Sequence, residues 1–184
     1  MERKYAWHNY DDATIEKVYA LSDTYRQFLD NGKTERECVV QAVEFAEAKG
    51  YVNLNDIIKS NSSIKAGDKI YYTHMDKSIA LFNIGTDDIE LGMNILGAHI
   101  DSPRIDVKQN PQYEDSNLVF WDTHYYGGIK KYHWVAMPLA IHGVVVKTDG
   151  TRININIGDK ETDPVFCITD LLPHLGQEQM QKNA

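Results

Sequence analysis

Two segments near the start of the chain carry apolar residues at helical spacing. In the first, residues 14–31, the apolar positions are Ile15, Val18, Tyr19, Tyr25, Phe28 and Leu29. Asn31-Gly32 follows this run and is a typical helix end. The second segment begins with a capping box, Thr34-Glu35-Arg36-Glu37, and continues to Gly50. The pattern therefore predicts two consecutive helices.

The next apolar runs have the composition of β-strands. Residues 69–74 and 78–84 are rich in Ile, Tyr, Leu and Phe and are separated by a short polar link, which predicts a β-hairpin. Residues 93–100 are more continuously apolar. Strands that are covered on both faces have this composition, so this segment is predicted to be a central strand.

The composition changes after Lys108, where residues 109–117 are polar and rich in turn formers. We expect a domain boundary here, which divides the chain into residues 1–108 and 109–184. Beyond the boundary, glycine-containing turns separate several strand-like segments. These segments are residues 118–126, 135–146 and 152–157. The second part of the chain is therefore expected to be rich in β-structure.

Composition and charge exclude several classes of function. The 184 residues are 42% hydrophobic and 25% charged, as in ordinary globular proteins. The formal net charge of -8 would repel nucleic-acid phosphates and anionic lipids, so neither nucleic acid nor a membrane is an expected partner. The sequence has no signal-like or membrane-length apolar stretch, and its two cysteines form no disulfide framework. We therefore expect a cytoplasmic location.

The residues that carry chemistry follow the predicted central strand. In an extended strand end, His99 and Asp101 would point the same way, because residues two apart share a face. A carboxylate beside a metal-binding histidine can orient the ring and raise its basicity. Pro103 lacks a backbone donor and helps to end the strand here. A histidine at a strand end is also often a structural residue that only makes hydrogen bonds. The spacing alone therefore leaves both the metal-binding and the structural interpretation open.

Three segments together resemble the M18 family of aspartyl-aminopeptidase-like zinc aminopeptidases. Residues 95–104, ILGAHIDSPR, are similar to the family's first metal-ligand motif. Residues 123–134, THYYGGIKKYHW, and 138–143, PLAIHG, resemble the start of its inserted dimerisation domain in the bacterial branch. The hairpin at 67–85 also lies in the matching place. The resemblance implies an α/β fold, namely an incomplete α/β/α catalytic domain in residues 1–108 and the first part of a β-rich inserted domain in 109–184.

The resemblance also implies roles for the two candidate site residues. His99 would bind one of two zinc ions, and Asp101 would be the catalytic-site carboxylate that holds His99. The metals would polarise the first peptide carbonyl of a peptide substrate, while a glutamate deprotonates the metal-bound water. The inserted domain would join subunits into a homo-oligomer. No residue is assigned to substrate binding, because the family builds most of that pocket from later sequence.

The chain also departs from the family pattern. The family's remaining ligands and its general base follow the inserted domain and have no counterpart in residues 1–184, so we expect this chain alone to be inactive. Some members carry a further histidine near the end of this region, and Glu178 stands at that position. The alternative is a non-catalytic assembly or regulatory module that keeps the front half of the fold. His124, His133 and His142 are expected to be surface or interface residues.

Overall fold

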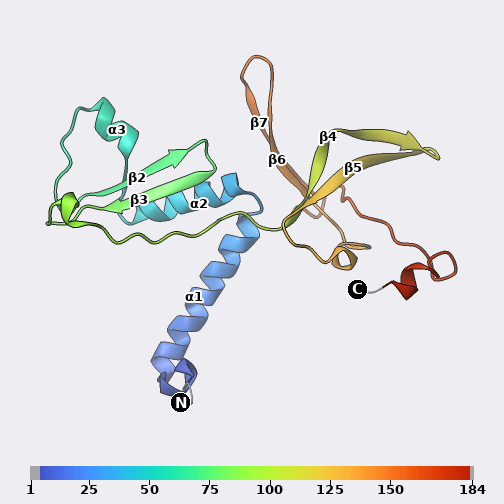
Figure 1. The fold of residues 1–184 in the computed structure, drawn as a ribbon, viewed down its shortest axis with the longest axis horizontal. Helices are drawn as coiled ribbons and strands as arrows, with labels where there is room; N and C mark the ends of the chain where they lie inside the picture. Colours follow the sequence, from blue (N-terminus) through green and yellow to red (C-terminus); the bar gives the residue numbers. More distant parts are fainter. Residues whose placement is uncertain (1–4, 183–184) are drawn as a thin grey trace. The chain divides into compact units, whose positions relative to one another are not determined.

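The computed structural model describes residues 5–182 and has a mixed α/β architecture (Figure 1). The chain forms two compact units, Met1–Asp101 and Ser102–Ala184. The first contains all three α-helices and a three-stranded sheet, and the second contains two two-stranded sheets. None of the helices within residues 5–182 is long and apolar enough to cross a membrane.

Both predicted helices are confirmed. A short 3-10 helix, η1 (Ala6–Asn9), precedes α1 (Asp12–Asn31), whose N-cap Asp11 accepts a 2.8 Å hydrogen bond from the Thr14 amide. Hydrogen bonding from Thr14 lowers the pKa of the Asp11 carboxyl. Helix α2 (Glu35–Ala48) begins with the predicted capping box between Thr34 and Glu37. Near the end of α1, Phe28 stacks on Phe45 of α2.

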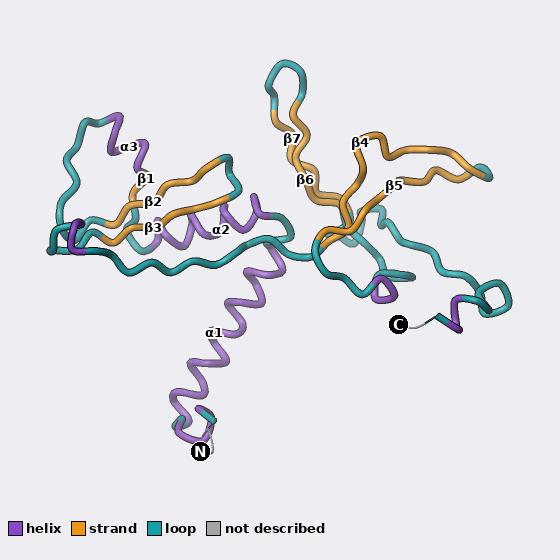
Figure 2. The backbone as a smooth tube through the Cα atoms, in the orientation of Figure 1, coloured by secondary structure: helices purple, strands orange, loops and turns teal. Residues whose placement is uncertain are grey.

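The predicted hairpin is also confirmed and is part of a small sheet (Figure 2). Strands β2 (Lys69–His74) and β3 (Ser78–Asn83) are antiparallel, and the short strand β1 (Val52–Asn53) is parallel to β2. Met75 and Asp76 both have positive φ, as a type I′ turn requires. Helix α3 (Leu54–Lys59), which the apolar pattern did not predict, follows β1.

The core of the first unit lies where α2 packs against this hairpin. Its buried residues are Cys38, Val39 and Ala46 from the helix and Ile70 and Tyr71 from β2. The Tyr71 hydroxyl donates a 2.7 Å hydrogen bond to the Glu47 carboxylate, so the polar end of this buried ring has a partner. Because neighbouring residues of a strand point to opposite faces, Ile70 and Tyr71 are buried on the two faces of β2, and Tyr71 is the one that bonds to α2.

The predicted central strand at residues 93–100 is wrong for this structure. After the 3-10 helix η2 (Ile89–Leu91), the chain runs to Pro103 without regular secondary structure. The sheet order is β1-β2-β3, and residues 93–100 pair with no strand of the described chain. The physical reason is that an apolar run becomes a central strand only where strands on both sides complete its backbone hydrogen bonds.

The second unit begins with a long hairpin that the sequence pattern only half predicted. Strand β4 (Arg104–Asp115) is antiparallel to β5 (Leu118–Tyr126), with Ser116 and Asn117 at positive φ in the turn. The register shifts between Val107 and Gln112. Pro111 lies in this irregular stretch, where a residue without a backbone donor interrupts no regular ladder.

The expected boundary after Lys108 falls inside β4, whereas the two units divide between Asp101 and Ser102. Both faces of this hairpin are largely exposed, so its sequence lacks the alternation of apolar and polar residues that marks a half-buried strand. For that reason residues 109–117 have the composition of a linker although they form a strand.

The rest of the second unit contains a shorter hairpin. Strands β6 (Ile141–Val146) and β7 (Arg152–Ile157) pair in register, which confirms the strand predicted at 152–157 and the end of the one at 135–146. Isolated bridges join Val135 to Ile168 and Leu139 to Phe166. Two 3-10 helices, η3 (Lys131–His133) and η4 (Gln179–Gln181), complete the unit.

Candidate metal centre

His99 and Asp101 lie at the end of the first unit, in the irregular segment that follows Gly92. The His99 side chain is 84% exposed, and that of Asp101 is 34% exposed. Residues 99–101 belong to no helix or strand. The structure thus places the two predicted residues together, although it does so without the strand that was expected to present them.

The hydrogen bonds of His99 define which ring nitrogen carries the proton. Nδ1 lies 3.0 Å from the Asp101 backbone oxygen and 3.0 Å from its Oδ1. A carbonyl oxygen only accepts hydrogen bonds, so Nδ1 is the donor and carries the hydrogen. In the neutral ring Nε2 then has a free lone pair. This tautomer, held by a carboxylate, is the form in which a histidine binds a metal through Nε2.

The described residues supply one ligand position and no complete metal site. Among residues 5–182, no group of three or more His, Cys, Asp or Glu side chains is arranged to hold a metal ion. A catalytic zinc ion needs about three protein ligands. The chemistry of His99 and Asp101 therefore fits one corner of a zinc site, and other residues would have to complete it.

Arg104 and Asp106, which follow the motif, make structural contacts in the second unit. Arg104 Nε donates a 2.7 Å hydrogen bond to Asp106 Oδ1, and the guanidinium lies 4.2 Å from the centroid of the Tyr126 ring. Arg104 and Tyr126 are also register partners in the β4–β5 hairpin. These contacts fix the base of the hairpin, in agreement with a structural role for the two charged residues.

The remaining histidines of the second unit do not gather at one place. His142 Nε2 lies 3.2 Å from Asp159 Oδ1, His124 Nδ1 donates to the Tyr125 carbonyl at 3.3 Å, and His133 packs edge-on against Tyr132. Sequence reasoning missed the His142–Asp159 pair. The turn at residues 147–150 could have indicated this pair. When the hairpin register is counted back from that turn, His142 lies opposite Asn156, and Asn156 contacts Asp159.

A mixed α/β fold in which an aspartate carboxylate contacts an exposed histidine is compatible with a protein that binds a metal ion through that histidine. Residues 28–184 match the profile of the family described as Aminopeptidase I zinc metalloprotease (M18). The chain belongs to the M18 family. The resemblance to this family is thereby confirmed, and zinc is the metal of this family.

Bacterial relatives match along the whole chain. A probable M18 family aminopeptidase 1 from Clostridium acetobutylicum is 51% identical over 183 residues, which cover 100% of this chain and 39% of the relative. The crystal structure of aminopeptidase I from the same species superposes with a TM-score of 0.84 and covers 99% of this chain and 40% of that chain. An M18 family structure from Thermotoga maritima is 46% identical, has a TM-score of 0.85 and covers 95% of this chain and 37% of its own.

The likeness extends to a distant relative at the level of the fold. The structure of yeast aminopeptidase 1 is 19% identical, with a TM-score of 0.67 over 83% of this chain. The α/β fold implied by the resemblance is therefore confirmed as part of the M18 fold. The chain spans about two fifths of the length of the bacterial relatives it matches.

Proposed function

We propose that residues 1–184 are the N-terminal portion of a zinc-dependent aminopeptidase that removes the N-terminal residue from peptides. His99 is a ligand to one of its two zinc ions, and Asp101 is the catalytic-site carboxylate that holds His99. The observation that carries the proposal is the Nδ1 contact of His99 with Asp101, in a chain that belongs to a zinc metalloprotease family.

The roles of the two residues follow from their geometry. His99 offers the Nε2 lone pair, and the Asp101 carboxylate accepts the Nδ1 hydrogen and orients the ring. Zinc, when bound, lowers the pKa of a bound water toward neutrality and polarises a carbonyl group. The exposure of His99 leaves room for a metal ion at Nε2 and for other ligands and a peptide to reach that metal.

The isolated chain is inactive in this proposal, because a lone histidine does not hold zinc for catalysis. In this proposal residues 1–108 belong to the catalytic domain and residues 109–184 are the start of the inserted domain. The protein is cytoplasmic, in agreement with two unpaired cysteines, Cys38 and Cys167. It is a homo-oligomer joined through the inserted domain, whose two-stranded sheets leave every strand with an open edge.

A chimera tests the proposal directly. Residues 1–184 would be joined to the remainder of the Clostridium acetobutylicum relative, which matches this chain at 51% identity. Zinc content and release of N-terminal residues from short peptides would be measured for the chimera and for residues 1–184 alone. We expect zinc binding and activity from the chimera and neither from the shorter chain.

The His99→Ala variant of the chimera tests the ligand role. Loss of this ligand is expected to lower activity by more than about 100-fold. That loss exceeds the roughly 10- to 100-fold effect of mutating a residue that only orients a metal ligand. The matched control is His74→Ala, which removes an exposed histidine from the end of β2. Full zinc content in the His99 variant would refute the assignment, and peptidase activity from residues 1–184 alone would refute the predicted inactivity.

A further inference from the structure

A small pocket of about 270 Å³ lies in the second unit, at the base of the long hairpin. Its walls are apolar and come from separate stretches of chain that the unit brings together. They are formed by Ile105, Ile129, Trp134, Val135 and Ile168. All five are half-buried, and the bridge between Val135 and Ile168 holds two of these stretches side by side. The pocket is therefore built by the fold rather than by one exposed side chain.

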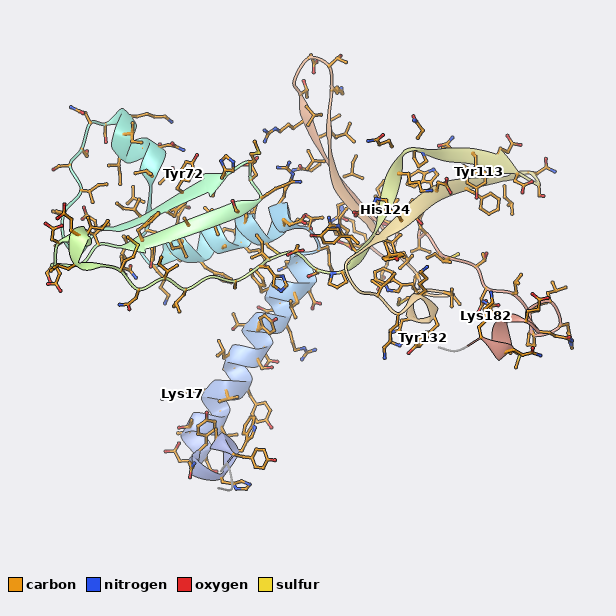
Figure 3. All side chains as sticks on the ribbon, viewed as in Figure 1. Lys17, Tyr72, Tyr113, His124, Tyr132 and Lys182 are labelled. Atoms are coloured by element: carbon orange, nitrogen blue, oxygen red, sulfur yellow. The ribbon has the colours of Figure 1, made fainter. Side chains whose placement is uncertain are left out.

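The rim of this pocket carries hydrogen-bond donors. Lys131 lies with Nζ 4.9 Å from the centroid of the Tyr125 ring, and it makes no ion pair with any carboxylate in residues 5–182. His124, labelled in Figure 3, donates its Nδ1 hydrogen to the Tyr125 carbonyl, so its neutral ring has no second N–H to offer an anion. The hydroxyl of Thr123 also has no hydrogen-bond partner among the described residues.

No acidic side chain lines this pocket in the described part of the chain. Asp106, the register partner of His124, is held by Arg104 at 2.7 Å. In a chain whose net charge is -8, this pocket is lined by the cationic Lys131 and by no carboxylate of the described residues. An anionic group placed at this rim would meet donors and no like charge.

We infer that this pocket binds a small apolar carboxylate. The apolar body of such a ligand would fill the walls around Trp134, and its carboxylate would accept hydrogen bonds from Lys131 and Thr123. The volume lies below the roughly 300–1,000 Å³ of pockets for drug-sized ligands. The ligand is therefore about the size of one apolar amino-acid residue.

The probe for this inference is 3-phenylpropionate, titrated into the whole chain and followed by heteronuclear NMR. Saturable shifts are expected at the indole N–H of Trp134, assigned with a Trp134→Phe variant, and at the amides of Ile129 and Ile168. The neutral 3-phenylpropionamide should bind about tenfold more weakly, because it lacks the charge-assisted hydrogen bond. Acetate, which has no apolar body, should give no saturable shift.

Lys131→Gln is the test variant, and Lys130→Gln is the matched control. Lys131 lines the pocket and Lys130 does not, and both are exposed, so neither change should disturb the fold. We expect Lys131→Gln to weaken 3-phenylpropionate binding about tenfold and Lys130→Gln to leave it unchanged. Equal binding of the acid and the amide, equal effects of the two variants, or shifts confined to residues outside the pocket would each overturn the inference.

Discussion

Two apolar regions of the first unit differ in how far their side chains are buried. Helix α2 and strand β2 contain the buried hydrophobic residues of the described chain, and Ile70 is only 2% exposed. In the segment that carries His99, the residues are equally apolar, yet Ile95 is 79% exposed. The difference lies in the partners of each region and not in its hydrophobicity.

The comparison shows what a hydrophobic pattern does and does not specify. Helix α2 and the hairpin are close in sequence, and each offers an apolar face that the other can cover. Residues 93–100 would need a strand on each side and cover on both faces, and no described element supplies these. Local elements therefore form a core here, while the segment that bears the candidate ligand lies outside that core.

The largest expected effect contrasts these two regions directly. Ile70→Ala should lower the free energy of unfolding by about 2–5 kcal/mol, because it leaves a cavity in the core of the first unit. Ile95→Ala should change it by less than about 0.5 kcal/mol, since an exposed side chain loses no burial. Urea denaturation of the chain followed by circular dichroism measures both. A similar loss in the two variants would show that residues 93–100 are buried in solution.

Elements with local partners were predictable from the sequence. The capping box of Thr34 and Glu37 and the apolar spacing that follows it identify α2, and two strand-like runs around Met75 and Asp76 identify the hairpin. Strand β4 was not predictable, because both of its faces are largely exposed and its sequence carries no alternating pattern. A continuous apolar run at 93–100 predicts burial, but it does not specify what buries it.

Of the candidate site, only the pairing of His99 with Asp101 was predictable from the sequence. The two-residue spacing of His99 and Asp101 suffices to bring Nδ1 to the carboxylate in an extended chain, and this contact forms without a sheet. The tautomer of His99 could be assigned only from the structure, because the contact with the backbone oxygen of Asp101 identifies Nδ1 as the donor. The pocket around Trp134 was not predictable, since its walls come from stretches that only the folded chain brings together.

The second-largest effect in this comparison concerns the contact between His99 and Asp101. In the chimera, Asp101→Asn should lower zinc affinity or activity about 10- to 100-fold, because an amide still accepts the Nδ1 hydrogen but places no negative charge beside the ring. Zinc titration and peptide hydrolysis measure the change. Asp87→Asn, which removes an exposed carboxylate from the turn after β3, is the control and should change neither quantity. An unaltered zinc affinity in the Asp101 variant would leave the carboxylate without its proposed role.

A smaller effect tests the polar contact of the packed region. Tyr71→Phe should cost about 1–2 kcal/mol at neutral pH, because it removes the hydroxyl that donates to the Glu47 carboxylate. That hydrogen bond raises the pKa of Tyr71 above its ordinary value of 10.0. A raised pKa in the folded state means that the contribution is complete below the unfolded-state pKa and is lost as the pH rises through the folded-state pKa.

The pH dependence separates this contact from simple packing. The difference in unfolding free energy between wild type and Tyr71→Phe should be constant from pH 7 to about pH 9 and should shrink above about pH 10. Denaturant titrations across this range give the difference at each pH. A difference that stays constant to high pH would show that the Tyr71 hydroxyl contributes nothing through Glu47.

The smallest effect tests how the packed region begins. Thr34→Ala removes the side chain that accepts from the Glu37 amide at the start of α2, and it should cost about 1 kcal/mol. Thr24→Ala is the matched control, because Thr24 lies in the middle of α1, where its hydroxyl donates to the Ala20 carbonyl and alanine is the better helix former. Denaturation should therefore show a loss for Thr34→Ala and none for Thr24→Ala. Equal effects would mean that α2 is stabilised by its packing against the hairpin and not by its cap. The buried core around Ile70 would then be sufficient to keep α2 folded.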